Sequence, residues 1–198
     1  CVADGDERNS MADTLKVLIE IPEGSSVKYE LDEETGEMMV DRIVPVSMGY
    51  PVNYGLITDT RGEDGDALDA LVFLSEKVVP GVVVKCKIIG MLEMEDEEGI
   101  DHKIICVPEK AKIDPVCGAW TSLDDISEAK KRQIRHFFEH YKDLEEGKWV
   151  KLKDWQTAEK ATAVLKKAQD LFDDEQEECE DCESCCEHCS GECKSDKK

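Results

Sequence analysis

Residues 81–107, GVVVKCKIIGMLEMEDEEGIDHKIICV, contain two long apolar or alternating runs separated by an acidic turn. Alternation of apolar and polar residues predicts β-strands, and the glycine-bearing polar cluster predicts a turn between them. Shorter runs of the same kind precede this stretch, divided by Gly, Pro, Asp and Glu clusters, at residues 16–22, 27–31, 37–43, 54–58 and 68–73. Closely spaced short strands of this kind predict a small, mostly antiparallel β-barrel.

Two amphipathic helices are predicted after the strands. In residues 122–141, Ser122 can cap the helix, and Asp125 lies in the first turn, where the helix dipole favours an anion. In residues 157–172, Thr157 can cap the second helix. Apolar residues at helical spacing define the two buried faces: Ile126, Ile134, Phe137, Phe138, Tyr141, Ala161, Val164, Leu165, Ala168, Leu171 and Phe172. The whole pattern predicts an α+β domain.

Composition narrows the classes of partner. The chain has 198 residues, which fit one domain with its own core, and no apolar run approaches the roughly 18 residues of a membrane helix. A soluble body without a membrane partner is expected. Forty-seven acidic against 25 basic residues give a net charge of −22, which repels nucleic acid and anionic membranes. Cations are the expected partners, although a charge that serves only solubility stays open.

The ten cysteines fall into two groups. Cys86, Cys106 and Cys117 are scattered through the body, where a buried reduced thiol behaves as a small hydrophobe, and this favours a cytoplasmic setting. Most others crowd the acidic residues 173–198, which have almost nothing apolar to bury and are predicted to be disordered unless metal or oxidation folds them. We divide the chain into a flexible arm (residues 1–14), a domain (residues 15–172) and an acidic Cys-rich tail (residues 173–198).

Two acidic turns are the candidate metal site. In residues 63–69, EDGDALD, three aspartates stand beside a glycine before a predicted strand, and the turn of residues 96–101 adds two more. Carboxylates that converge in this way provide the hard oxygen ligands that Mg²⁺ prefers, whereas their mutual repulsion is costly without cations. The alternative for each turn is a solvated surface cluster. The candidates are Asp64, Asp66, Asp69, Asp96 and Asp101.

Basic and phenolic residues can complete a site for a phosphate compound. Lysine and arginine bind anionic oxygens, and tyrosine hydroxyls donate hydrogen bonds. Each residue alone is equally well explained as surface or as packing, so only the set is informative. Its members are Lys28, Arg42, Lys103, Lys142, Tyr50, Tyr54 and Tyr141.

Five separated blocks of this sequence resemble the family I soluble inorganic pyrophosphatases, over roughly residues 16–172. The blocks are IEIPEGSSVKYELDEETGEMMVDR (19–42), YPVNYGLITDT (50–60), EDGDALDALV (63–72), DEEGIDHK (96–103) and HFFEHYKDLEEGKWVK (136–151). The resemblance implies an OB-like barrel flanked by two helices, with the active site at the barrel mouth. It also implies a magnesium-dependent hydrolase of inorganic diphosphate, with several ions per site, that forms a homo-oligomer, with a hexamer favoured.

The resemblance also implies a role for each matching residue. Asp66 corresponds to the acceptor of the proton from the attacking water, and Asp64, Asp69, Asp96 and Asp101 correspond to magnesium ligands. Lys28, Arg42, Tyr54 and Tyr141 correspond to residues that hold the diphosphate, and Glu20, Glu30, Lys103 and Lys142 also line the cavity. Tyr50 is a further cavity candidate.

The Cys-rich tail departs from the family pattern. The spacing of Cys179, Cys182, Cys185 and Cys189 matches a ferredoxin motif, but Ser190 replaces its proline and no second motif follows. Two alternatives lead for the tail. In the first, these thiols bind a soft metal together with Cys186, Cys193 and His188; in the second, the tail is reduced and has no site. Two rival functions remain. The first is a catalytically dead scaffold whose tail binds soft metal. The second is an OB-like binder of nucleic acid, which the negative charge of the chain disfavours.

Overall fold

The structure is a computed structural model that describes residues 14–32, 35–62 and 65–186, with the backbone alone from residue 177 onward. Its elements in chain order are β1 (Leu15–Ile21), β2 (Val27–Leu31), β3 (Met38–Ile43), β4 (Asn53–Ile57), β5 (Asp69–Val72), β6 (Val83–Asp96), β7 (Gly99–Ile100), β8 (Lys103–Pro108), η1 (Cys117–Ala119), η2 (Leu123–Asp125), α1 (Glu128–His140), β9 (Val150–Thr157) and α2 (Ala158–Cys186).

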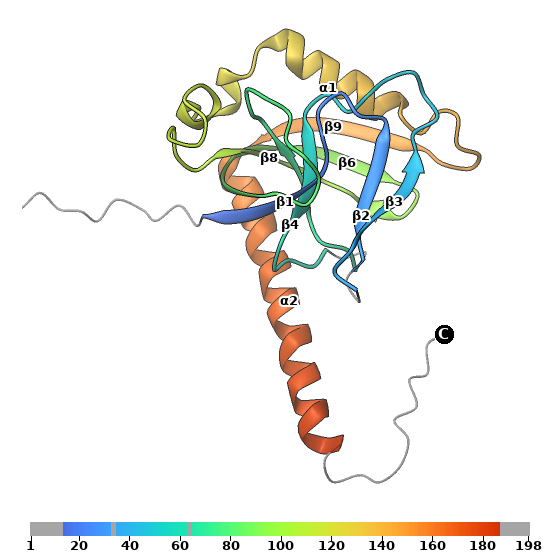
Figure 1. Ribbon diagram of the computed structural model, residues 1–198, viewed down its shortest axis with the longest axis vertical. Helices are drawn as coiled ribbons and strands as arrows, with labels where there is room; N and C mark the ends of the chain where they lie inside the picture. Colours follow the sequence, from blue (N-terminus) through green and yellow to red (C-terminus); the bar gives the residue numbers. More distant parts are fainter. Residues whose placement is uncertain (1–13, 33–34, 63–64, 187–198) are drawn as a thin grey trace, which may run out of the picture.

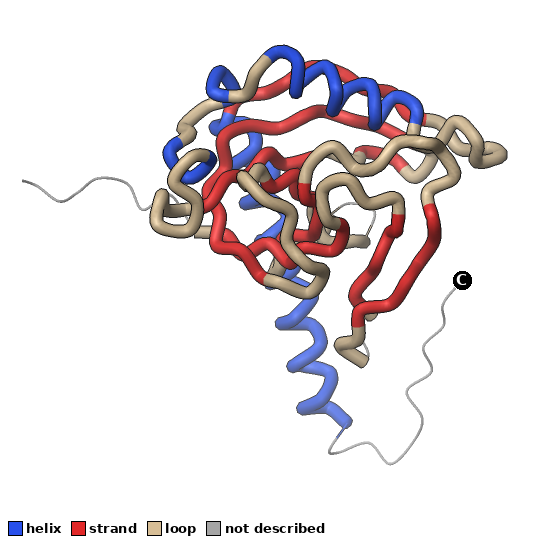
Figure 2. Tube along the Cα trace, turned by 45° about the horizontal axis from the view of Figure 1, so that its top comes forward, coloured by secondary structure: helices blue, strands red, loops and turns tan. Residues whose placement is uncertain are grey.

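Five strands form a ring, which confirms the predicted barrel. Their order is β1-β4-β5-β8-β6, and β6 pairs back with β1 to close it. All these pairings are antiparallel except that of β5 with β8. The long strand β6 also pairs with β7 and β9. Strands β2 and β3 form a separate antiparallel ribbon, which Figure 2 shows set apart from the ring.

Close contact between β1 and β4 depends on Gly55. A Cβ atom at this position would lie 1.9 Å from the carbonyl oxygen of Leu18, so no side chain fits without moving the backbone of β1. Glycine in a strand often marks such a close approach. Gly55 thereby brings together the two strands that carry Glu20 and Tyr54.

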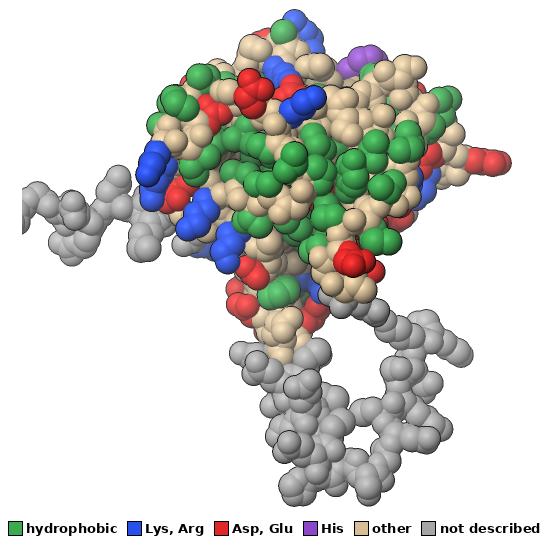
Figure 3. All heavy atoms as spheres, viewed as in Figure 1, with side chains coloured by type: hydrophobic (Ala, Val, Ile, Leu, Met, Phe, Trp, Pro, Cys, Tyr) green, Lys and Arg blue, Asp and Glu red, His purple; other side chains and the backbone are tan. Residues whose placement is uncertain are grey.

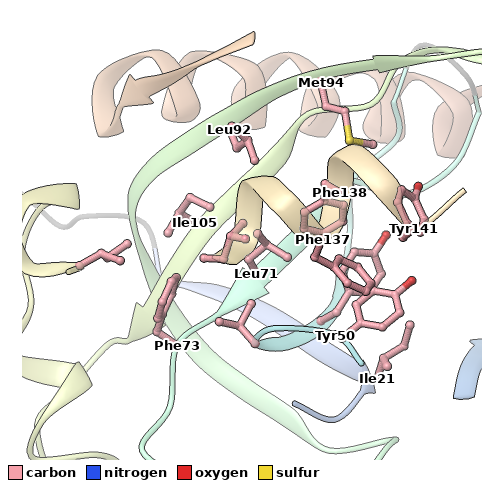
Figure 4. Packing of buried hydrophobic residues seen from close by; sticks show 14 of the residues in the cluster. Ile21, Tyr50, Leu71, Phe73, Leu92, Met94, Ile105, Phe137, Phe138 and Tyr141 are labelled. Carbon is pink, nitrogen blue, oxygen red and sulfur yellow. The ribbon is translucent and has the colours of Figure 1, made fainter. Parts of the chain in front are cut away.

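The two helices flank the barrel as predicted. Helix α1 lies across one end of the barrel, and α2 runs along its side and extends beyond it (Figure 1). The core beneath α1 is rich in aromatic side chains, several of which Figure 4 labels, including Phe137, Phe138 and Tyr141. A second cluster packs Ala161 and Leu165 of α2 against the barrel strands. The ring is therefore held between two apolar clusters.

The first helix begins later than predicted. Ser122 and Asp125 do form a capping box, but it caps the short 3-10 helix η2 and not α1. Ile126 then adopts an extended conformation, and Ser127 caps α1 by accepting a hydrogen bond from the Lys130 amide at 3.2 Å. The predicted start of α1 was wrong because two serine-led turns follow one another here, and only the second leads into an α-helix.

Strand β9 was not among the predicted strands, although Val150–Thr157 pairs along much of β6. Helix α2 also continues past Phe172 to Cys186, where the sequence had indicated disorder. Residues 173–186 contain neither Pro nor Gly and are rich in Glu, a good helix former, so the helix can continue without burying its surface. Thr157 caps it loosely, as its hydroxyl lies 3.5 Å from the Lys160 amide.

Candidate active site

A cavity of about 550 Å³ opens among the barrel strands, the β2–β3 ribbon and α2. Every residue predicted for the phosphate and magnesium site whose side chain is described lines it: Asp66, Asp69, Asp96, Asp101, Lys28, Arg42, Lys103, Lys142, Tyr50, Tyr54, Tyr141, Glu20 and Glu30. Asp64 lies outside the described residues, so its place in the site stays a prediction. The two acidic turns, which are separate in the sequence, thus meet in one hollow.

A buried lysine joins two of the predicted magnesium ligands. Lys103 of β8 is only 2% exposed, and its Nζ contacts the Asp69 carboxylate and lies 2.5 Å from Asp101 Oδ1. The same ammonium group lies 3.4 Å from the Tyr54 hydroxyl. Asp69 begins β5, which pairs in parallel with β8, so the barrel topology places this lysine between the two acids.

One ammonium group does not compensate the two half-buried carboxylates equally. Burial alone would raise the pKa of Asp69, but the attraction of Lys103 outweighs it, and the pKa lies below its usual value. Burial raises the pKa of Asp101 to about 6, and the negative charge of Asp69 adds to this shift. The pKa of Lys103 is raised, because its two carboxylates outweigh the effect of burial. The cavity therefore favours additional positive charge.

A bulge turns Glu20 into the same cavity. The register of β1 against β4 shifts between Ile19 and Ile21, which pair with neighbouring residues and leave Glu20 between them. Bulges often redirect a side chain in this way. Glu20 is 6% exposed, and burial, with a further contribution from Asp69, raises its pKa to about 7.

Asp96 is held at the second turn. Its Oδ1 accepts hydrogen bonds from the backbone amides of Glu98 at 2.9 Å and Gly99 at 3.3 Å, and its Oδ2 accepts one from Lys142 Nζ at 2.8 Å. Lys142 also donates to Glu97 at 3.1 Å. This network ties the β6–β7 turn to the segment that follows α1, and it fixes a lysine and an aspartate on one wall.

Two further cations lie on the opposite ribbon. Lys28 of β2 and Arg42 of β3 are cross-strand partners, so their side chains project from the same face. Lys28 Nζ lies 3.2 Å from the Asp41 carboxylate, and Arg42 donates to Glu145 at 3.0 Å. Both lie in the half-exposed range, within reach of an anion that enters the cavity.

Three tyrosines form an aromatic wall beside these charges. The Tyr50 ring lies 5.1 Å from that of Tyr54 and 4.7 Å from that of Phe137, and Tyr141 stacks on Phe137 at 5.5 Å. Figure 4 shows Tyr50 and Tyr141 flanking Phe137. Burial raises the pKa of each tyrosine. The hydroxyls therefore keep their protons and act as hydrogen-bond donors.

Sequence reasoning missed several residues that line the cavity, among them Arg61, Glu145, His102 and Lys167. Glu145 stands in a block quoted above and could have been proposed from it. Arg61 stands alone in a polar turn, and nothing in the sequence separates it from a solvated surface arginine.

The cavity suits Mg²⁺ by the chemistry of its donors, since the predicted ligands are carboxylates. Within the described ranges, no three acidic, His or Cys side chains converge on one point, and ammonium groups lie against Asp69, Asp101 and Asp96 instead. Among the cysteines with described side chains, Cys86, Cys106 and Cys117 are free and buried. The tail side chains Cys179, Cys182, Cys185, Cys186, His188, Cys189 and Cys193 lie outside the described residues.

No helix in the described part of the chain has both the length and the apolar character needed to cross a membrane.

A five-stranded barrel whose cavity combines aspartates, lysines, arginine and tyrosines has the side chains that a metal-dependent hydrolase of phosphate compounds requires. The family model for inorganic pyrophosphatase matches residues 17–173. The curated inorganic pyrophosphatase of Aquifex pyrophilus is 51% identical over 151 residues, 76% of this chain and 85% of the relative. That of Aeropyrum pernix is 47% identical over 171 residues, 86% of this chain and 95% of the relative.

Solved structures agree with these matches. The inorganic pyrophosphatase of Helicobacter pylori superposes with a TM-score of 0.79 at 45% identity, covering 86% of this chain and 99% of its own. That of Thermus thermophilus superposes with a TM-score of 0.75 at 38% identity, covering 87% and 97%. The chain belongs to the family I inorganic pyrophosphatases, and it hydrolyses inorganic diphosphate. Members of this family depend on a metal ion, generally Mg²⁺.

Proposed function

We propose that Asp66 accepts the proton of the attacking water, while Asp69, Asp96 and Asp101, with Asp64, hold several Mg²⁺ ions. The observation that supports this assignment best is the Lys103 bridge, because it leaves two half-buried carboxylates with one compensating charge. When bound, Mg²⁺ supplies positive charge that offsets the charge of the diphosphate and lowers the pKa of the attacking water.

The protein side chains bind and orient the diphosphate. Lys28 and Arg42 project from one face of the β2–β3 ribbon, and Lys142 lies on the opposing wall. Tyr54 and Tyr141 keep their protons and donate hydrogen bonds to phosphate oxygens. Positioned positive charge and donors stabilise charge on the departing phosphate, which is where most of the acceleration of a phosphoryl transfer arises. Tyr50, Glu20, Glu30 and Lys103 complete the wall of the cavity.

The first test is phosphate release from diphosphate by the full chain, with Mg²⁺ and with EDTA. We expect fast release that EDTA abolishes and that added Mg²⁺ restores. Release that is unaffected by EDTA would contradict the proposed metal site. The same assay with Mn²⁺ or Zn²⁺ in place of Mg²⁺ measures how strictly the carboxylates select the ion.

We propose that the chain assembles as a homo-oligomer, with a hexamer favoured. The solvent-exposed side chains Met39, Val40 and Ile43 lie on β3, and the exposed segment around Val79 and Val83 runs beside that strand, since a Cβ atom added at Gly81 would lie 3.7 Å from Met38 Cγ. Figure 3 shows hydrophobic side chains gathered on this face. Exposed apolar patches of this kind mark protein interfaces. Sedimentation that shows only a monomer at micromolar concentration would contradict this proposal.

We also propose that the protein is cytoplasmic, because its described cysteines are buried thiols. Cys86 and Cys106 are buried among the barrel strands, and burial raises the pKa of both thiols, which makes them unreactive. Such thiols suit a reducing, cytoplasmic setting. Localisation of the tagged full chain by microscopy tests it.

A further inference from the structure

Arg61 makes contacts that the proposed mechanism does not use. Its side chain lines the cavity, and its Nη1 donates a hydrogen bond of 2.6 Å to the backbone carbonyl of Gly65. Gly65 directly precedes Asp66. Two backbone hydrogen bonds hold Gly62 close to Gly65 and Asp66. The Gly62 amide donates to the Asp66 carbonyl at 2.7 Å, and the Gly65 amide donates to the Gly62 carbonyl at 3.2 Å. The guanidinium thus holds the backbone next to the proposed proton acceptor.

The other end of this arrangement is fixed to α2. The Arg61 Nε donates to the Glu175 carboxylate at 2.9 Å, and the Arg61 backbone amide donates to the Ala168 carbonyl at 2.8 Å. Both partners belong to α2, which packs on the barrel through Ala161 and Leu165. The planar guanidinium has donors fixed in a rigid fork, so it can reach two acceptors at once, which a lysine cannot do equally well.

We propose that Arg61 is a positioning residue that ties the backbone next to Asp66 to helix α2, with Glu175 as part of its anchor. This inference rests on the proposed function, because it acts through the role assigned to Asp66. It also gives the part of α2 beyond Phe172 a task in the reaction, since Glu175 lies in the segment where the sequence had predicted a tail.

A direct contact between Arg61 and the diphosphate is the competing explanation, because the side chain lines the cavity. Two described groups already engage the guanidinium: the Gly65 carbonyl and the Glu175 carboxylate. A substrate contact would require the arginine to leave the carboxylate, so removing Glu175 would help binding. A positioning role predicts the opposite, because loss of Glu175 loosens the anchor. The two explanations therefore predict opposite effects of a Glu175 substitution on activity: a gain for a substrate contact and a loss for a positioning role.

The test compares Arg61→Ala, Arg61→Lys and Glu175→Gln with the wild type, in phosphate release at saturating Mg²⁺. For Arg61→Ala we expect kcat to fall about tenfold with KM nearly unchanged, because a small misplacement of a reacting group can cost about 10²-fold. Arg61→Lys should recover only part of this loss. Glu175→Gln should lower kcat about two- to fivefold, since exposed ion pairs are weak.

Arg135 provides a matched control. It also donates to a backbone carbonyl, that of Lys153 at 2.6 Å, and it pairs with Glu139 at 3.5 Å, but it does not line the cavity. Arg135→Ala and Glu139→Gln remove the same kinds of contact elsewhere on the protein, so kcat should stay within about twofold of the wild type. An equal loss of kcat in both arginine variants would overturn the inference in favour of a general effect on stability.

A double-mutant cycle separates this inference from the proposed function. If Arg61 acts through Asp66, Arg61→Ala should cause no further loss in an Asp66→Asn background. An additive loss, or a rise in KM with unchanged kcat, would overturn the positioning role. A wild-type rate in Asp66→Asn alone would instead contradict the proposed role of Asp66. Hydrogen exchange at the Gly62 and Gly65 amides gives a readout without turnover, and it should be faster in Arg61→Ala and unchanged in Arg135→Ala.

Discussion

Two sites in this protein, one half-buried and one buried, hold carboxylates in opposite ways. In the cavity, Asp69 and Asp101 share the single ammonium group of Lys103. Beside Ser75, just past the end of β5, Asp114 is buried among neutral donors and accepts four hydrogen bonds. They come from the Ser75 amide at 2.6 Å, the Ser75 hydroxyl at 2.9 Å, the Val116 amide at 2.8 Å and the Cys117 amide at 3.1 Å. The cavity has fewer positive charges than carboxylates at this point, whereas hydrogen-bond donors fully surround the Asp114 carboxylate.

The pKa values reflect this difference. Burial alone would raise the pKa of Asp114, but the backbone donors outweigh it, and the pKa lies below its usual value. In the cavity, burial raises the pKa of Asp101 to about 6 and that of Glu20 to about 7. A carboxylate that is satisfied by dipoles stabilises the fold, whereas carboxylates that share one compensating charge cost stability and favour a further cation. Substitutions in the cavity should therefore change phosphate release or the response to Mg²⁺, whereas substitution of Asp114 should change stability alone.

The largest effect is expected at Asp66. Asp66→Asn removes the proposed proton acceptor, and we expect kcat for phosphate release to fall by about 10²- to 10⁴-fold, the usual contribution of general-base catalysis. Thermal unfolding should stay close to that of the wild type. Asp154→Asn, at an exposed acid of β9, is the matched control and should leave both quantities unchanged. An unaltered rate in Asp66→Asn would contradict the assignment.

Lys103→Met should have the next largest effect. It leaves Asp69 and Asp101 facing one another without the ammonium group, and removing one member of a buried ion pair costs about 3 to 5 kcal/mol. Because both carboxylates are half-buried, we expect a loss near the lower end of this range. Urea denaturation in EDTA should show this loss in the free energy of unfolding, and saturating Mg²⁺ should recover part of it.

Lys87→Met is the control for this lysine, because Lys87 donates to a neutral acceptor, the Gly118 carbonyl, at 3.1 Å. We expect a loss of about 1 kcal/mol there, without a response to Mg²⁺. If Mg²⁺ had the same effect on both variants, the carboxylates around Lys103 would not be the site that takes up the ion.

Glu20 should give a smaller effect that depends on pH. Its pKa is about 7 in the folded protein against 4.5 as the ordinary value, so the folded state binds the proton more tightly. Its contribution to stability is therefore fully present below about pH 4.5 and is lost as pH rises through 7, by at most about 1.4 kcal/mol per pH unit. Glu20→Gln should raise the free energy of unfolding by about 1 to 3 kcal/mol at pH 8 in metal-free buffer and change it little at pH 4.5. Parallel pH curves for variant and wild type would contradict this.

Asp114→Asn should give the smallest effect, with the opposite dependence on pH. The side-chain amide cannot accept all four hydrogen bonds, and we expect a loss of about 1 to 2 kcal/mol at pH 7 by urea denaturation. The contribution of the carboxylate is present above its ordinary pKa of 3.8 and disappears as pH falls through the lower folded value, so the gap to the wild type should close in acid. Phosphate release should be unchanged, and a large loss of kcat would remove the distinction between the two sites.

Local patterns in the sequence predicted a small barrel and the two acidic turns, whereas the resemblance to inorganic pyrophosphatases implied the OB-like kind of barrel and cavity residues such as Glu20 and Glu30. Asp66 and Asp69 stand in one acidic turn and Asp96 and Asp101 in another, and carboxylates at such spacing indicate a cation site before any fold is known. The alternation in residues 81–107 likewise marked the strands that bring the two turns together. Strand β9 also alternates, at Val150 and Leu152, but its lysines and its place between two helices concealed it.

Features that depend on distant contacts could not be predicted. Arg61 and Glu175 are separated by 114 residues, and Ser75 and Asp114 by 39, so only the fold brings each pair together. The late start of α1 is a different case. Both Ser122 and Ser127 are good caps, and between them Ile126 is buried at 2% exposure in an extended conformation, which no local signal in the sequence indicates.

The order of the ring strands along the chain bears on how the protein matures during synthesis. All five, from β1 to β8, lie within Leu15–Pro108, and β1 closes the ring by pairing with β6. Tyr141, Lys142 and the α2 residues that complete the cavity are translated later. Because α1 and α2 supply side chains to the two apolar clusters that hold the ring, the barrel gains its full packing only after these later segments have been made. The last third of the chain therefore completes the core and the cavity together.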